Sequence, residues 1–139
     1  MSKTDKVVRY LNGYQKAFVR WVYCSEQIKL LRDKQTAAGS PNLSGMPRAN
    51  GAIDLSDYIV RLEMQIEECT RKREKAREEM RKVKNAIVEV FDETDRKILN
   101  YRYLDFMSFA EIAELMNMSK STVARRHETA CERLYRKIM

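Results

Sequence analysis

The 139-residue chain contains one histidine, four glycines, two prolines and three cysteines. Cys24, Cys69 and Cys131 lack the paired spacing of a zinc site or a disulfide framework, so we expect reduced thiols that pack as small apolar side chains. The single histidine, His127, and the lack of a nucleophile motif or a glycine-rich phosphate loop both argue against catalysis. We therefore expect no enzymatic activity, no cofactor and no metal site.

Long apolar runs are also missing. No segment approaches the ~18 apolar residues of a membrane-spanning helix, and no secretory signal pattern opens the sequence. We therefore expect a cytoplasmic protein that has no membrane partner.

Basic residues are in excess, with a net charge of +7. Residues 119–139 carry six basic and two acidic side chains, whereas residues 85–118 carry seven acidic and three basic ones. A basic segment beside an acidic support is typical of a DNA-facing helix, so double-stranded DNA is the expected partner. The basic run at 71–77 is a second candidate DNA contact, although a solvated helix face is favoured.

Two long helices are predicted before residue 90, from about 4 to 35 and from 55 to 90. Apolar residues recur at alternating steps of three and four along both segments. The connecting loop at 36–54 is rich in glycine, proline, serine and asparagine, so the helices are expected to form an antiparallel hairpin. The second helix carries the longer seam: Leu55, Ile59, Leu62, Ile66, Cys69, Arg73, Ala76, Met80, Val83, Ile87 and Val90.

The predicted fold is all-α, with two domains. Residues 1–90 form the helical hairpin, an oligomerisation region, and residues 91–139 form a helix-turn-helix domain. A two-helix hairpin leaves much of its seam uncovered, which favours a homo-oligomer, most simply a dimer. Alternatively, the long helices only pack on the DNA-binding domain of their own chain.

Residues 108–134 have the spacing of a helix-turn-helix. Ser108 and Glu111 form a capping box, Asn117 suits a turn that needs positive φ, and Ser119 is a good N-cap for the second helix. Val123, Ala130 and Leu134 form an inward stripe on that helix. Asp92 is expected to cap a preceding helix that ends near Asp105.

The outward side of the second helix would enter the major groove. Contacts to base edges are expected from its first turns and contacts to phosphates from later arginines. The predicted DNA-binding residues are Lys120, Ser121, Thr122, Arg125, Arg126, Arg133 and Arg136. Arg102 is either a phosphate contact or an ion-pair partner of Asp95, Asp105 or Glu111, and His127 is expected to be a packed or boundary residue.

From Leu99 to Leu134 the sequence resembles the fourth conserved region of sigma factors, which reads the promoter −35 element. The likeness rests on Leu-Asn-Tyr-Arg-Tyr-Leu-Asp, Ser-Phe-Ala-Glu-Ile-Ala-Glu-Leu-Met and Met-Ser-Lys-Ser-Thr-Val. No counterpart of the promoter-melting region is present. The resemblance implies DNA binding without promoter opening, and it leaves contact with host RNA polymerase open.

A second resemblance involves the loop, Ser44-Gly45-Met46-Pro47-Arg48 with Gly51, and the following Asp54-Leu55-Ser56-Asp57-Tyr58. It is similar to late-gene activators of the RinA, ArpU and LtrC type, from phages and integrative elements of Gram-positive bacteria. This resemblance implies an activator of phage packaging and lysis genes. No mechanism follows for Met46-Pro47-Arg48.

The leading functional prediction is a sequence-specific transcription regulator. One alternative is a small DNA-packaging (terminase small) subunit, which also joins a helix-turn-helix to oligomerising helices. Another is a structural helical scaffold that does not bind DNA. The sequence determines neither the operator nor the choice between activation and repression.

Overall fold

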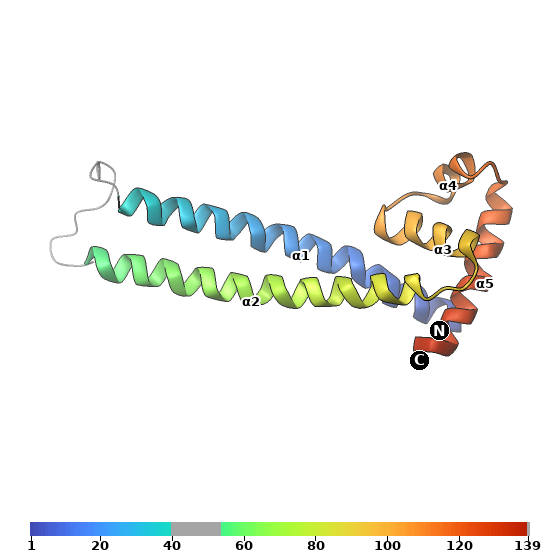
Figure 1. Cartoon of the computed structure of the whole chain (residues 1–139), viewed down its shortest axis with the longest axis horizontal. Coiled ribbons are helices and arrows are strands. Elements are labelled where there is room, and N and C mark those ends of the chain that lie inside the picture. The colour runs from blue at the N-terminus through green and yellow to red at the C-terminus, as the bar shows by residue number, and fades with distance from the viewer. Residues whose placement is uncertain (40–53, 139) are drawn as a thin grey trace. The chain divides into compact units, whose positions relative to one another are not determined.

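The computed structural model describes residues 1–39 and 54–138, and the predicted all-α fold is confirmed. No strand occurs within these two ranges. The elements, in chain order, are α1 (Lys3–Ala38), α2 (Leu55–Val88), α3 (Glu93–Leu99), the π-helical turn η1 (Asn100–Leu104), α4 (Phe109–Leu115) and α5 (Lys120–Ile138) (Figure 1).

The two long helices begin at polar caps. At the start of α1, the Ser2 hydroxyl accepts from the Asp5 amide at 3.0 Å, and the Ser2 amide donates to the Asp5 carboxylate at 3.2 Å. At the start of α2, Asp54 accepts from the amide and the hydroxyl of Ser56. Both predicted long helices are present, and α1 continues three residues beyond its predicted end. Most of the predicted loop, including Met46-Pro47-Arg48, lies outside the described residues.

The chain divides into two compact units. The first, here called the terminal unit, comprises Met1–Phe18 and Arg77–Met139; the second, the hairpin unit, comprises Val19–Ala76. This division differs from the predicted boundary between residues 90 and 91, which stays a prediction. The difference arises because the beginning of α1 and the end of α2 pack with the later helices.

In the hairpin unit, α1 and α2 share a small apolar core. Ile28 and Leu31 of α1 are buried together with Leu62 and Ile66 of α2, and Tyr58 and Cys69 pack against them while partly exposed. Residues toward the end of α1 thus meet residues toward the start of α2, which is the pairing that an antiparallel hairpin requires.

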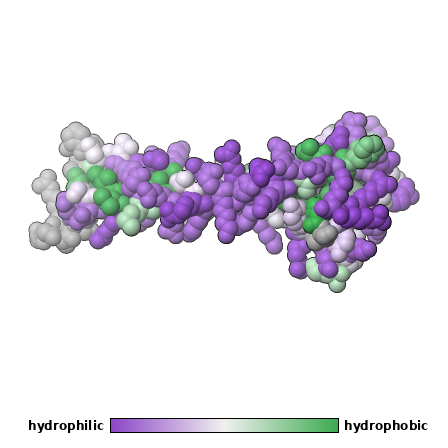
Figure 2. All heavy atoms as spheres, turned by 60° about the horizontal axis from the view of Figure 1, so that its bottom comes forward, coloured by the Kyte–Doolittle hydropathy of each residue, from purple (hydrophilic) through white to green (hydrophobic). Residues whose placement is uncertain are grey.

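Along the middle of α1, small side chains are more deeply buried than the large aromatic ones. Ala17 and Cys24 are buried, whereas Trp21 and Phe18 are only partly buried. Small side chains let two helices approach closely, so the larger rings lie at the edges of the contact. On the face drawn in Figure 2, hydrophilic side chains cover most of the surface of the long helices.

The terminal unit contains a core to which helices far apart in the sequence contribute. Val7 and Leu11 of α1 are fully buried with Ile87 of α2, and Leu99 and Leu134 complete the centre of this cluster. Burial of such side chains is worth about 1.5–3 kcal/mol each. The beginning of α1 is therefore part of the support for α5.

A second cluster in the terminal unit lies between the short helices. Ile98, Ile112, Ala113 and Val123 are buried there, and α3 and α4 both pack against α5. In the described residues, no helix combines the length and apolar character needed to cross a membrane.

Candidate nucleic-acid interface

The first helix of the pair, α4, begins with the predicted capping box. The Glu111 amide donates to the Ser108 hydroxyl at 3.1 Å, and the Ser108 amide donates to the Glu111 carboxylate at 3.2 Å. These hydrogen bonds, chiefly the one from the Ser108 amide, hold the pKa of Glu111 below its usual value. The start of α4 is thus fixed by two reciprocal local contacts.

The turn between α4 and α5 has the geometry expected from Asn117, whose φ is 54°. The next amide, that of Met118, donates to the Ala113 carbonyl at 2.9 Å and closes the end of α4. The Met118 side chain is partly buried against the core around Ile112 and Val123. Met118 thus fills the space beneath the turn with an apolar side chain.

Ser119 caps α5, as predicted. Its hydroxyl accepts from the Thr122 amide at 3.1 Å and also lies 2.7 Å from the Thr122 hydroxyl. The Ser121 hydroxyl is 3.2 Å from the same oxygen. Thr122 is partly buried, so its hydroxyl is less available to an external partner than that of the exposed Ser121.

The two sides of α5 differ sharply. Val123, Ala130 and Leu134, the predicted inward stripe, are no more than 2 % exposed. Lys120, Ser121 and Arg125 are exposed on the other side. Within the described residues, the Arg125 guanidinium makes no ion pair or hydrogen bond with another side chain, so it is available to a ligand.

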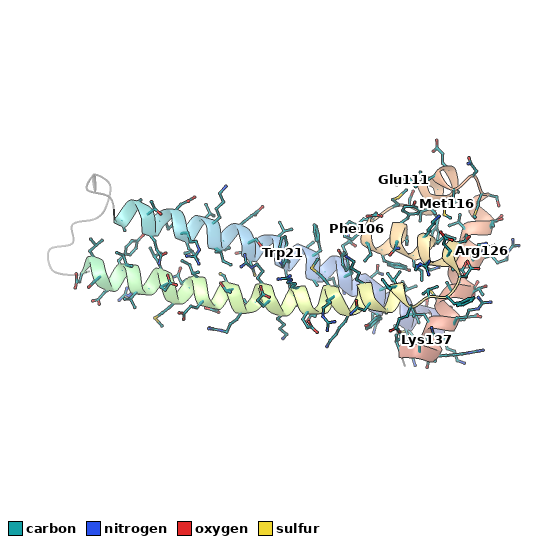
Figure 3. All side chains as sticks on the ribbon, in the orientation of Figure 1. Trp21, Phe106, Glu111, Met116, Arg126 and Lys137 are labelled. Carbon is teal, nitrogen blue, oxygen red and sulfur yellow. The ribbon has the colours of Figure 1, made fainter. Side chains whose placement is uncertain are left out.

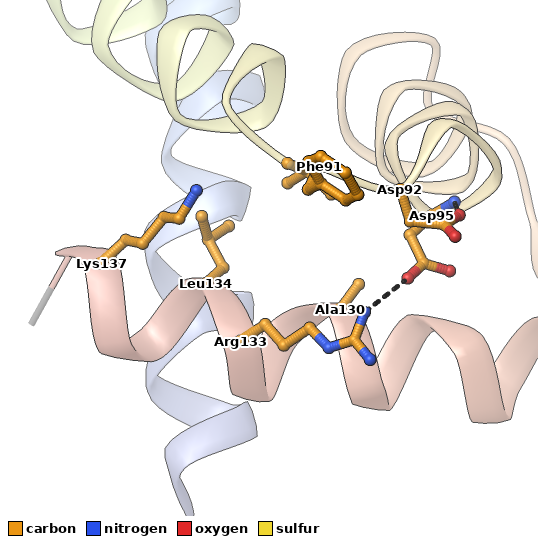
Figure 4. A pocket seen from close by; sticks show the side chains of 8 residues that line it. Phe91, Asp92, Asp95, Ala130, Arg133, Leu134 and Lys137 are labelled. Carbon is orange, nitrogen blue, oxygen red and sulfur yellow. Dashed lines mark hydrogen bonds and ion pairs between the residues drawn. The ribbon is translucent and has the colours of Figure 1, made fainter.

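Two of the predicted phosphate contacts have protein partners. Arg126 Nη1 lies 3.3 Å from Asp95 Oδ1 and 3.6 Å from Asp92 Oδ1. Arg133 Nη1 lies 3.9 Å from Asp95 Oδ2. Figure 3 labels Arg126 on α5, and Figure 4 shows Arg133 with Asp92 and Asp95 around a pocket also lined by Phe91 and Lys137.

Sequence reasoning missed the link between Asp95 and α5. The two residues of the closest pair, Asp95 and Arg126, are 31 positions apart, and no spacing rule relates them. Asp92 was predicted only as a helix cap, a role that its 2.9 Å hydrogen bond from the Asp95 amide confirms. This hydrogen bond is the main reason that the pKa of Asp92 lies below its usual value, and the charge of Arg126 contributes.

Arg136, the last predicted phosphate contact, is exposed near the end of α5. It lines a surface hollow together with Glu128 and Glu132. The cationic side of α5 is therefore interrupted by acidic residues toward its C-terminus. Its first turns carry the clearest positive surface.

Arg102 has a structural role, but its partners differ from those predicted. Its Nη1 donates to the Met107 carbonyl at 3.0 Å, and its guanidinium lies 4.6 Å from the centre of the Phe109 ring. Instead of a predicted carboxylate such as that of Asp105, the Arg102 guanidinium contacts a backbone carbonyl and an aromatic ring. Arg102 thus ties η1 to the start of α4.

His127 is buried, in agreement with the prediction of a packed or boundary residue. Its Nε2 is 2.6 Å from the Tyr103 hydroxyl and 3.7 Å from Cys131 Sγ, and its ring meets Phe109 edge-on at 5.0 Å. Burial, with a smaller contribution from the charge of Arg102, lowers the pKa of His127 to about 4. The imidazole is therefore neutral near pH 7.

Residues 88–136 match the family model of Sigma-70, region 4. No curated protein and no solved structure matches the chain. The match covers the end of α2 and the short helices through most of α5, so this segment is a helix-turn-helix of the region 4 type. The likeness to phage late-gene activators stays a prediction.

Proposed function

We propose that this protein is a non-enzymatic, sequence-specific DNA-binding transcription regulator that reads duplex DNA with α5. The observation that carries the proposal is the two-sided character of α5 directly after the Asn117 turn. Its first turns expose Lys120, Ser121 and Arg125, while Val123 fixes the helix to its support. The major groove is about 12 Å wide and admits a helix with such a polar, cationic outer side.

The exposed side chains differ in what they would contact. Arg125 and Lys120 offer donors that suit guanine O6 and N7, and Ser121 suits either base type. Thr122, with its hydroxyl held by Ser119, offers chiefly its methyl group. Arg136 would meet phosphates, which position the protein without specifying sequence.

The test begins with selection of bound fragments from the source genome, which supplies the cognate site. On that site, Arg125→Ala should weaken binding by about 1–3 kcal/mol and relax the sequence preference, because a base contact is lost. Fluorescence anisotropy on cognate and random duplexes measures both effects. Arg81→Ala, an exposed cation of α2, serves as the control.

Equal loss of affinity on cognate and random DNA would contradict the assignment of Arg125 to a base edge. If the wild-type protein shows no salt-dependent binding to any duplex, the proposed function is wrong as a whole, since backbone contacts weaken steeply with salt.

The specific role we propose is activation of phage late genes, for packaging and lysis, in the cytoplasm of the bacterial host. Its support is the resemblance of residues 44–58 to late-gene activators together with the region 4 match. Contact with host RNA polymerase accompanies this role. Selected fragments should lie upstream of late genes, and fragments scattered without relation to promoters would contradict it.

We further propose that the protein acts as a dimer. In the hairpin unit, α1 exposes Val19, Tyr23 and Leu30 by 53–61 %, and α2 exposes Val60 and Met64 by 55–62 %. Exposed apolar side chains of this kind favour association. Native mass spectrometry should show two copies; a large ring would favour the DNA-packaging alternative, and a monomer would contradict self-association.

A further inference from the structure

Asp95 is an unusual residue in this fold because it is a buried carboxylate. In the part of the chain that the structure describes, it and His127 are the buried polar or charged residues, and Asp95 is only 4 % exposed. It lies on α3, one turn after the cap residue Asp92. Its carboxylate is directed at α5, where Arg126 and Arg133 approach its two oxygens.

A buried carboxylate is expensive to leave without a cationic partner. Arg126 is the closer partner, since its Nη1 is within 3.3 Å of Asp95 and also within 3.6 Å of Asp92. Arg133 is 3.9 Å from Asp95, and its side chain is 67 % exposed, so it is held less firmly. A DNA phosphate that recruited Arg126 would have to replace two carboxylates, and the buried Asp95 would keep only the longer contact with Arg133.

The neighbouring Arg125 provides the contrast. It is exposed and belongs to the same turn of α5, yet no carboxylate of the described residues is paired with it. The two adjacent arginines therefore face different surroundings. Arg125 is directed to solvent, and Arg126 is directed to the acidic pair Asp92 and Asp95.

We propose that Asp95 is a positioning residue that holds Arg126 away from the DNA backbone. By pairing with this arginine, Asp95 lowers the positive charge that α5 offers to any duplex. The inference rests on the proposed function and names a role for a residue that does not itself touch DNA. It also reassigns Arg126 from a phosphate contact to a tie between helices.

The salt dependence of binding to a random-sequence duplex tests this role, because each phosphate contact contributes about 0.9 to the slope of log K against log salt. Arg136→Gln, at the exposed arginine assigned to phosphates, should make the slope less steep by about 0.9. Arg126→Gln, the same substitution on the same helix, should leave the slope unchanged. Fluorescence anisotropy over a salt series measures both.

The Asp95→Asn variant should change the salt dependence in the opposite direction. It removes the buried charge at nearly constant volume, so Arg126 keeps only the more exposed Asp92 as a carboxylate partner and can turn to a phosphate. The slope should steepen by about 0.9. If the two proteins bind random DNA equally at 1 M salt, the variant should therefore bind it about eightfold more tightly than the wild type at 0.1 M salt. Binding to the cognate site should tighten by a similar factor, because a phosphate contact does not depend on sequence.

Each possible result of these experiments supports or overturns a specific claim. Equal loss of slope for Arg136→Gln and Arg126→Gln would show that Arg126 meets phosphate and would overturn the inference, as would an unchanged slope in a folded Asp95→Asn protein. If circular dichroism shows that Asp95→Asn does not fold, the comparison of the two arginine variants decides. Absence of any binding by the wild-type protein overturns the proposed function, and this inference with it.

Discussion

At the scale of single residues, the backbone adopts positive φ at two non-glycine positions that the structure describes. Asn117 has φ of 54° and Phe106 has φ of 59°. Asn tolerates this region through local hydrogen bonding, whereas a bulky residue rarely adopts it. The Phe106 ring lies 5.7 Å from that of Phe18 and 6.2 Å from that of Tyr14, all in the terminal unit. Packing against α1 therefore compensates for the strained backbone at Phe106.

Replacing Asn117 separates backbone strain from side-chain contacts. Asn117→Ala should lower the free energy of unfolding by about 1 kcal/mol, because a Cβ without a compensating polar group is disfavoured at positive φ. Asn117→Gly is the control and should be close to neutral. Urea denaturation followed by circular dichroism measures both, and equal effects of Ala and Gly would argue against strain as the cause.

His127 makes the stability depend on pH. Its pKa is about 4 in the folded protein and near the ordinary value of 6.5 when unfolded. The unfolded state therefore binds more protons between these values, so stability is fully present above pH 6.5 and is lost as the pH falls toward 4. Allowing for partial solvent screening, the loss attributable to His127 is about 2 kcal/mol.

Nearby carboxylates also titrate in this range, so the measurement needs a reference variant. In His127→Gln, the fall in unfolding free energy from pH 7 to pH 4.5 should be about 2 kcal/mol smaller than in the wild type. If the two proteins lose the same stability over this range, the imidazole is not protected from protonation.

At the scale of elements, short-range capping determines where the small helices begin. The Ser108–Glu111 box starts α4, Asp92 starts α3 through its hydrogen bond from the Asp95 amide, and Ser119 starts α5. Each contact spans three residues, which makes it recognisable in the sequence. The predicted helix from Asp92 to Asp105 is present, but its second half is the π-helical η1.

The capping box gives a prediction for α4. Ser108→Ala removes the acceptor of the Glu111 amide and should cost about 1 kcal/mol of stability. Ser108→Thr keeps a hydroxyl and should retain most of it. Amide hydrogen exchange at Glu111 is the direct readout, and unchanged protection in the alanine variant would contradict a capping role.

At the scale of the whole molecule, the core of the terminal unit connects α1 to the DNA-binding helices. Leu11 is fully buried in a cluster that includes Ile87, Leu99 and Leu134. This contact agrees with the alternative raised from the sequence, that the long helices pack on the DNA-binding domain of their own chain. The contact does not decide whether two chains also associate through the hairpin unit.

The support that α1 gives to α5 predicts a long-range effect. Leu11→Ala should destabilise the terminal unit by about 2–5 kcal/mol, since it opens a cavity in a packed core. Leu30→Ala, on the same helix but 53 % exposed, is the matched control and should have little effect. Hydrogen exchange should increase in α5 for the first variant alone, and an unaffected α5 would show that α1 is not part of its support.

The sequence by itself determined the helical class, the two long helices, the helix-turn-helix and the exposed polar side of α5. These features depend on periodicity and on hydrogen bonds between residues three or four positions apart. Only the tertiary structure decided which arginines of α5 are paired, because Asp95 and Arg126 meet through the packing of α3 on α5. The tertiary structure alone also decided the positive φ of Phe106 and the contribution of α1 to the core of the terminal unit. Both features depend on contacts between distant segments that no local pattern specifies.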